Sequence, residues 1–515
     1  MSVAITPRAG RREWIGLCVL GLACVLYSMD LTVLHLAVPQ ISADLQPTSS
    51  QLLWIIDIYG FFVAGSLITM GNLGDKIGRR RLLMIGGICF ASTSVIAAFS
   101  TSAEMLIVAR ALLGVSGATL APSTLSLIRN MFHDQKQRVV AIGVWISAFS
   151  AGAAIGPLVG GVLLEYFWWG SVFLLAVPVM GILLILGPIL LPEFKDPKAR
   201  RLDVFSAALS LAAILSVIYG IKLFAQNGIE FHSALFVMFG VALAVIFLKR
   251  QKNLSNPLID LHLFRIPAFT TSLFTFLFGI FMAFGVFLFI SQYLQLVLGL
   301  SPLEAGLWML PWAVAFVAGT QITPLLMRKL KPGTIIAGGL ILSAIGFGLL
   351  IQVDENTSFE LLVTAFVISS FGLSPVFTLA TELVIGSAPP ERAGSASAIS
   401  ETTAELGGAL GIAVFGSIGV AIYRNELSAA MSSSIPQDML EIARDTLGAA
   451  VLISQQLPSE LGSLLLSAAR TAFLHGMHLS IFISVILAFV TAVLVLVSLR
   501  NELGNNESKV EDRSV

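Results

Sequence analysis

Long apolar stretches separated by short polar turns run through almost the whole chain. A helix needs about 20 apolar residues to cross a lipid bilayer, and strand periodicity is absent from these stretches. Fourteen of them are long enough, and they cover approximately residues 14–38, 51–71, 82–100, 103–127, 138–163, 170–191, 203–224, 232–249, 268–297, 303–327, 333–352, 359–386, 396–423 and 472–499. The pattern therefore predicts an all-α polytopic membrane protein with fourteen transmembrane helices.

Composition agrees with a membrane protein. Of the 515 residues, 56% are hydrophobic and 12% are charged, whereas soluble domains carry about 25% charged residues. The net charge is zero, so nothing points to a nucleic-acid partner. Cys18, Cys24 and Cys89 all fall in apolar stretches, where they are expected to be small buried hydrophobic residues. We expect no metal and no cofactor.

Basic residues concentrate in every second turn. With the N-terminus in the cytoplasm, the turns on that side hold 25 of the 30 Lys and Arg residues. The other five are Arg110 and Lys222, within apolar stretches, and Arg424, Arg444 and Arg470, in one long loop. Because cytoplasmic loops carry an excess of Lys and Arg, this distribution predicts a multi-pass membrane protein with both termini in the cytoplasm.

Three segments interrupt the alternation of helix and short turn. Residues 193–202 are rich in charge and predict a cytoplasmic linker. Residues 424–471 predict a long external loop, with apolar residues at helical spacing that indicate one or two short helices. The polar tail 501–515 is expected to be disordered.

The stretch Gly71–Leu83 reads Gly-Asn-Leu-Gly-Asp-Lys-Ile-Gly-Arg-Arg-Arg-Leu-Leu and predicts a tight, charged turn at a membrane surface. It resembles the loop between helices 2 and 3 of the major facilitator superfamily of transporters. By this resemblance Gly71, Asp75, Gly78 and Arg79 form a cytoplasmic gate loop. The resemblance also implies that Asp75 and Arg79 reach the end of the thirteenth helix. Because an Asp at a helix N-terminus is stabilised by about 0.3–1 kcal/mol, we expect the turn to act as a cytoplasmic latch.

Residues 152–161 read Gly-Ala-Ala-Ile-Gly-Pro-Leu-Val-Gly-Gly. Small residues four apart make a smooth face for close helix contact, and proline bends a helix. The sequence is similar to the antiporter motif of the same superfamily, which favours export over symport. The residues that carry this similarity are Gly152, Gly156, Pro157, Gly160 and Gly161.

The segment Met29–Pro39 resembles the signature of the fourteen-helix drug:proton antiporters, a branch that includes quaternary-ammonium and methyl-viologen efflux pumps. The segment departs from that signature at Met29, His35 and Val38. The resemblance implies a major facilitator fold of two six-helix bundles with an inserted helical hairpin. The implied parts are an N-terminal bundle (1–192), the linker (193–202), the inserted helices (203–250) and a C-terminal bundle (251–500).

Charged residues inside apolar stretches are candidates for function, because each costs roughly 2.5–3.5 kcal/mol at the bilayer centre. Asp30 is expected to be a protonatable or cation-binding carboxylate; the alternative is a structural Asp bonded to Thr32. Asp57 is either part of a cation site or a near-surface group. Arg110 needs a buried partner, and by resemblance it takes part in proton coupling; the alternative is a purely structural ion pair.

Two acidic residues stand out in the second half of the chain. Glu401 and Glu405 are four residues apart and share one helix face. Two nearby carboxylates repel, so one is expected to hold a proton that it can exchange for a cation. A solvated position of Glu401 near the cytoplasmic entrance is the alternative.

Aromatic rings attract organic cations, although most rings in membrane proteins face lipid or core. The rings that we expect to line a substrate cavity are those of Trp54, Tyr59, Phe284, Tyr293, Trp308 and Trp312.

Together with the resemblance, these observations predict a proton-coupled antiporter that exports lipophilic cations. The resemblance also implies that the protein lies in the bacterial inner (cytoplasmic) membrane and works as a monomer in the lipid bilayer. A proton-coupled transporter of a specific metabolite is the alternative within transport. A membrane receptor or channel is the alternative from another class. An enzyme is not expected, and no nucleotide-binding loop of the Walker type is present in the sequence.

Overall fold

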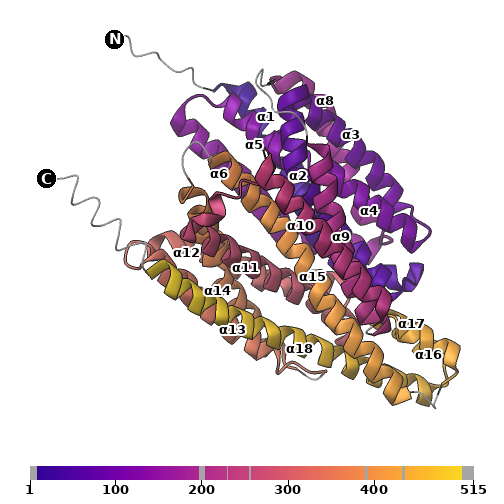
Figure 1. Ribbon diagram of the computed structural model, residues 1–515. Coiled ribbons are helices and arrows are strands. Elements are labelled where there is room, and N and C mark those ends of the chain that lie inside the picture. Colours follow the sequence, from indigo (N-terminus) through magenta and orange to yellow (C-terminus); the bar gives the residue numbers. More distant parts are fainter. Residues whose placement is uncertain are drawn as a thin grey trace, which may run out of the picture. The chain divides into compact units, whose positions relative to one another are not determined.

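The computed structural model describes residues 9–195, 203–228, 230–254, 257–355, 357–388, 393–431 and 435–500 (Figure 1). All regular secondary structure in these ranges is helical. Most of the predicted linker (196–202) and the predicted tail (501–515) lie outside the described residues.

The described residues of the first half of the chain form ten α-helices. They are α1 (Arg11–Leu45), α2 (Ser49–Ile77), α3 (Arg79–Ala98), α4 (Ala103–Gly117), α5 (Leu120–Met131), α6 (Gln135–Tyr166), α7 (Ser171–Leu174), α8 (Ala176–Leu190), α9 (Val204–Asn227) and α10 (Phe231–Asn253).

In the second half, the part of the chain that the structure describes adds eight α-helices, one 3-10 helix and one π-helix. They are η1 (Leu263–Arg265), α11 (Pro267–Gln292), η2 (Tyr293–Val297), α12 (Pro302–Leu326), α13 (Pro332–Leu350), α14 (Phe359–Gly386), α15 (Ala393–Met431), α16 (Gln437–Ala443), α17 (Leu447–Gln456) and α18 (Ser459–Arg500).

Fourteen of the described helical spans are long and apolar enough to cross a membrane. Three of these spans combine two elements each, namely α4 with α5, α7 with α8, and α11 with η2. The sequence prediction of an all-α polytopic membrane protein with fourteen spans is therefore confirmed.

Polar residues in the short turns start several of these helices. The Thr48 hydroxyl accepts a hydrogen bond from the Gln51 backbone N–H at 3.3 Å, and the Gln51 side chain accepts one from the Thr48 N–H at 2.9 Å. Ser102 and Asp134 accept bonds from backbone N–H groups at the starts of α4 and α6. Such caps satisfy N–H groups that have no partner inside the helix.

Two boundaries differ from the sequence prediction. The charged turn is shorter than expected, because α2 continues to Ile77 and α3 begins at Arg79. The loop predicted over 424–471 is also shorter, because α15 extends to Met431 and α18 begins at Ser459. The short helices expected in that loop are α16 and α17; residues 432–434 lie outside the described part.

The chain packs as two compact units. The first consists of residues 1–215 and 300–307, and the second of residues 216–299 and 308–515. In the first unit α1 packs on α6, α2 on α4, and α3 on α4 and α8. In the second, α11 packs on α15, and α13 lies beside α14 and α18 (Figure 1). The boundary falls inside α9, so the inserted hairpin 203–250 stays a prediction.

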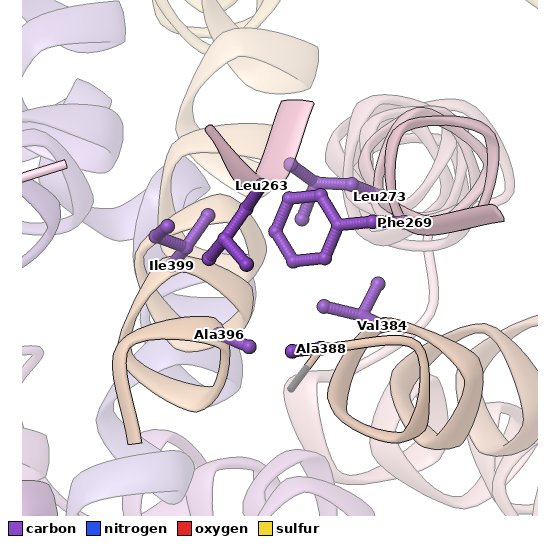
Figure 2. Close-up of a cluster of buried hydrophobic side chains, with 7 residues drawn as sticks. All are labelled: Leu263, Phe269, Leu273, Val384, Ala388, Ala396 and Ile399. Carbon is purple, nitrogen blue, oxygen red and sulfur yellow. The ribbon is translucent and has the colours of Figure 1, made fainter. Parts of the chain in front are cut away.

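A cluster of buried apolar side chains fixes one end of the second unit. Figure 2 shows its members, which come from η1, the start of α11, the end of α14 and the start of α15: Leu263, Phe269, Leu273, Val384, Ala388, Ala396 and Ile399. Each is at most 8% exposed. The cluster holds the start of α15 two residues before Glu401.

Polar contacts join the helix ends at 424–471 to the rest of the second unit. Arg424 pairs with Asp445 at 2.5 Å between Nη1 and Oδ1, and the Tyr423 hydroxyl donates to the Ala443 carbonyl oxygen at 2.9 Å. Nε of Arg470 donates to the carbonyl oxygen of Leu296 in the π-helix at 3.1 Å. The first two bonds tie α15 to α16 and the turn after it, and the third ties α18 to η2 at the end of α11.

Candidate functional site

Asp30 and Arg110 form a buried ion pair in the first unit. Nη1 of Arg110 on α4 lies 2.5 Å from Oδ2 of Asp30 on α1, and its Nε donates to the carbonyl oxygen of Ile55 on α2 at 3.2 Å. The Arg110 side chain is 1% exposed and that of Asp30 is 12% exposed. Three helices therefore meet at one guanidinium, and the partner that a buried arginine requires is Asp30.

Aromatic rings enclose the same guanidinium. Cζ of Arg110 lies 4.6 Å from the ring centre of Tyr59 and 5.9 Å from that of Phe173. Both rings are buried, and ring faces attract cations. Arg110 therefore has partners that do not depend on the charge of Asp30, and Tyr59 faces Arg110 in this structure.

Two more titratable side chains are buried nearby along the same helices. Asp57 on α2 is 1% exposed, and so is His35 on α1; His35 lies within electrostatic range of Arg110. Trp54 is half-buried, with its ring centre 6.5 Å from that of Phe61. Asp57 is thus buried within the protein, and its place in a cation site or near the membrane surface stays a prediction.

A small cavity lies beside Asp30. It is lined by this carboxylate and by apolar side chains that include Met29, Leu34, Phe90 and Phe173. The carboxylate consequently has an open side, whereas the guanidinium of Arg110 is closed off.

The glycines of α6 set the distance between α6 and α1 beside Asp30. A Cβ atom on Gly156 would overlap the Thr32 hydroxyl, and one on Gly152 would overlap the Val25 carbonyl oxygen. A Cβ on Gly160 would lie 3.0 Å from the Val33 side chain. The motif therefore packs against the stretch of α1 that carries the carboxylate, as small residues at helix contacts do.

The last residues of the motif meet the start of α12 within the first unit. A Cβ on Gly161 would lie 2.8 Å from the carbonyl oxygen of Pro302, and a Cβ on Gly306 would lie 2.5 Å from that of Pro157. Glycine on each helix permits this second close contact.

The gate loop contains a single residue outside the helices. Gly78 has φ +114°, a conformation that side chains rarely adopt, and it joins α2 directly to α3. Gly71 and Asp75 lie within the last turns of α2. Asp75 pairs with Arg79 at 2.6 Å between Oδ1 and Nη2, and Nη1 of Arg79 donates to the Pro122 carbonyl oxygen at 3.3 Å.

Glu193 is a further partner of this turn, and the sequence analysis assigned it only to the linker. Its Oε1 accepts from the Arg80 backbone N–H at 3.1 Å, and its Oε2 lies 3.6 Å from Nε of Arg80 and 3.8 Å from Nε of Arg81. The backbone N–H of Arg79 donates to the Phe194 carbonyl oxygen at 2.9 Å. The sequence indicates only that Glu193 is an acid directly after an apolar span. Its contact with the start of α3 follows from the fold.

In the second unit, Glu401 and Glu405 lie half-buried on one side of α15. The glycines that follow pack on α11. A Cβ on Gly408 would lie 3.4 Å from the Phe284 ring, and one on Gly411 would overlap the Phe281 carbonyl oxygen. The structure thus brings both carboxylates to the helix surface that meets the phenylalanines of α11.

The aromatic residues predicted for this unit have different surroundings. Trp308 and Trp312 are half-buried on α12, and Trp312 lines an apolar cavity together with Phe287 and Phe347. Tyr293 is fully buried, and its hydroxyl donates to the Asp354 carbonyl oxygen at 2.8 Å. Tyr293 therefore ties the end of α11 to a turn.

Some of the predicted site residues lie together within one unit. In the first unit Asp30 and Tyr59 both meet Arg110, and in the second Glu401 and Glu405 lie on the helix whose Gly408 packs on Phe284. The roles assigned to these residues stay predictions. Within the described ranges, no three His, Cys, Asp or Glu side chains are grouped so that they could hold a metal ion.

Comparison with known proteins shows which family the chain is related to. A profile of the Major Facilitator Superfamily matches residues 20–412. The multidrug efflux pump LfrA of Mycolicibacterium smegmatis is 40% identical, over 96% of this chain and 98% of that protein. The methyl viologen resistance protein SmvA of Salmonella typhimurium is 36% identical, over 91% of this chain and 95% of that protein.

A solved structure shares the fold. The bacterial homologue of the human lysosomal transporter Spinster aligns over 95% of this chain and 99% of its own, with a TM-score of 0.67 and 18% identity. Together with the profile match over most of the chain, this confirms the resemblance seen in the sequence: the chain belongs to the Major Facilitator Superfamily.

Proposed function

We propose that this chain is a proton-coupled antiporter that exports lipophilic cationic drugs, biocides and dyes across the bacterial cytoplasmic membrane. Its substrates would include quaternary ammonium compounds and ethidium-like cations. Membership of a transporter family and likeness to relatives named as efflux and resistance proteins support drug export. The observation that carries proton coupling is the buried pair of Asp30 and Arg110.

Protonation changes the contact between two helices in this scheme. A proton on Asp30 makes the carboxylate neutral and removes the ion pair between α1 and α4. Arg110 keeps the Ile55 carbonyl oxygen and the Tyr59 ring, so it stays in place while α1 is released. Loss of the proton restores the pair, so that proton binding is linked to helix position.

Substrate cations bind on the acidic and aromatic surface of the second unit. Glu401 and Glu405 supply negative charge on α15, and half-buried rings such as Trp312 supply cation–π attraction. Binding of a cation neutralises charge that a proton would otherwise neutralise. The two ligands therefore compete electrostatically, as an antiporter requires.

Charge balance determines which part of the proton gradient drives export. The membrane potential contributes about 2.3 kcal/mol per charge per 100 mV. Exchange of one proton for one monovalent cation moves no net charge, so the pH difference alone drives it. More than one proton per cation would add the potential as a driving force.

Purified protein in liposomes tests the proposal. Ethidium should accumulate on the acidic side of an imposed pH gradient, with the potential clamped by valinomycin and potassium. Addition of nigericin should abolish the accumulation, and protein-free liposomes give the background. Ethidium transport that continues undiminished after both gradients are collapsed would show that proton coupling is wrong.

A further inference from the structure

A row of aromatic side chains runs along one face of α12 in the second unit. Trp308, Trp312 and Phe316 recur every four residues, a spacing that keeps them on one face of a helix. At 1.5 Å per residue they span about 12 Å along the helix axis. Phe316 was not among the rings expected to line a substrate cavity.

Each member of this row meets a ring from a neighbouring helix. The distances between ring centres are 4.3 Å for Trp308 and Phe359, 5.8 Å for Trp312 and Phe287, and 5.2 Å for Phe316 and Phe377. Within the row, the rings of Trp312 and Phe316 are 5.7 Å apart and inclined by only 9°. Helices α11, α12 and α14 therefore build one continuous aromatic surface.

The row lies on the inner face of α12. The most exposed side chains of this helix, among them Val314 at 66% and Leu325 at 55%, lie on the opposite face, as expected for contact with lipid. Trp312 and Phe316 are nevertheless only half-buried. Part of the ring surface of both residues is thus accessible near the middle of the span.

Phe377 connects this row to the acidic helix. It packs in a cluster with Phe276 and with Ala404 of α15, and Ala404 directly precedes Glu405. Glu401 is three residues before Ala404 and therefore shares its face of α15, whereas Glu405, as the next residue, is turned about 100° away from Ala404 around the helix. The negative charge is placed at one end of the aromatic surface.

We propose that this aromatic surface selects flat, polycyclic aromatic cations and that Phe316 is the residue that determines this selectivity. The inference rests on the proposed export of organic cations. A flat cation gains both ring stacking and cation–π attraction, whereas an aliphatic quaternary ammonium ion gains only the second. Phe316 is assigned this role because it joins Trp312 to Phe377, the ring that packs in the cluster with Ala404 of α15.

Calorimetric titration of the full-length protein in detergent with ethidium and with tetrabutylammonium tests the inference. Phe316→Leu keeps an apolar side chain of similar size and should weaken ethidium binding about fivefold, with tetrabutylammonium binding changed less than about twofold. Phe316→Trp should retain ethidium binding. The matched control is Phe274→Leu, at a ring 48% exposed on α11, and it should bind both cations as the wild type does.

The outcomes separate this inference from the proposed function. If Phe316→Leu loses equal affinity for both cations, or loses no affinity for ethidium, the selectivity assigned to Phe316 is wrong. The proposed export of cations is then unaffected. A wild-type protein that binds neither cation would overturn the proposed function and this inference together. An unchanged melting temperature of Phe316→Leu shows that a selective loss of ethidium is not a folding defect.

Discussion

The Arg110 guanidinium shows how much of a coupling site one residue can organise. It contacts a carboxylate on α1, a backbone carbonyl on α2 and two rings, while almost no surface is exposed. Only the carboxylate among these partners changes charge. A proton reaching Asp30 therefore alters one contact out of several, and this favours a change in helix packing over local unfolding.

Asp30→Asn should abolish the exchange while largely preserving the fold. The amide is nearly isosteric and can still accept a hydrogen bond from Arg110, but it cannot bind and release a proton. We expect ethidium accumulation under a pH gradient to fall about tenfold or more. We also expect a lower melting temperature, because a buried hydrogen bond to a charged group contributes about 1.5–3 kcal/mol.

Asp30→Glu is the matched control, because it keeps a titratable carboxylate one methylene longer. It should retain part of the transport that Asp30→Asn loses. If Asp30→Asn carries ethidium against its gradient as fast as the wild type does, the proton is bound elsewhere and the role given to this pair is wrong.

The contact between α6 and α1 is the feature of the helices most closely tied to this pair. Glycine at positions 152, 156 and 160 lets α6 approach the stretch of α1 from Val25 to Val33, and the Ser28 hydroxyl donates to the Phe149 carbonyl oxygen at 2.7 Å across the contact. A change in this distance would move Asp30 relative to Arg110.

Gly156→Ala tests this arrangement. Its methyl group would overlap the Thr32 hydroxyl, so the helices must separate, at a cost of about 1–3 kcal/mol for overpacking. Melting temperature and pH-driven ethidium accumulation should both fall. Gly143→Ala on the same helix is the control, because nothing lies within 4 Å of its Cβ; it should be neutral or slightly stabilising. Equal effects of the two substitutions would show that close contact at Gly156 is unimportant.

The sequence predicts the existence of these elements better than their limits and contacts. Apolar length alone indicated fourteen spans, and the spacing of the α6 glycines indicated a helix contact. The length of the charged turn was overestimated. Gly71 and Asp75 are compatible with a helix, and of these residues only Gly78 has a positive φ. That Asp30 is the partner of Arg110, and Glu193 that of Arg80, depends on which helices are neighbours, and no local pattern encodes this.

For the whole molecule, the proposed cycle requires a change between states, and the turn at Gly78 is where we expect its rate to be set. Asp75 is held by Arg79, which also donates to the Pro122 carbonyl oxygen in the first turn of α5. Asp75→Asn should lower ethidium turnover about two- to fivefold, the equivalent of the 0.3–1 kcal/mol of a helix-terminus charge, with ethidium affinity little changed. Lost affinity with normal turnover would count against the latch.

The sidedness of the whole molecule can be tested at two exposed positions. The distribution of Lys and Arg predicts that α16 faces the outside and that the turn between α5 and α6 faces the cytoplasm. Gln437→Cys, at the start of α16, should react with a membrane-impermeant maleimide in intact cells. His133→Cys, in the α5–α6 turn, should react only after the cells are made permeable.

The native Cys18, Cys24 and Cys89 lie within helices of candidate membrane spans, so the wild type serves as the background. An odd number of spans between the two positions is required for opposite sides, and the structure has nine from α6 to α15. Labelling of both positions from the same side would therefore contradict the fourteen-span topology as well as the orientation.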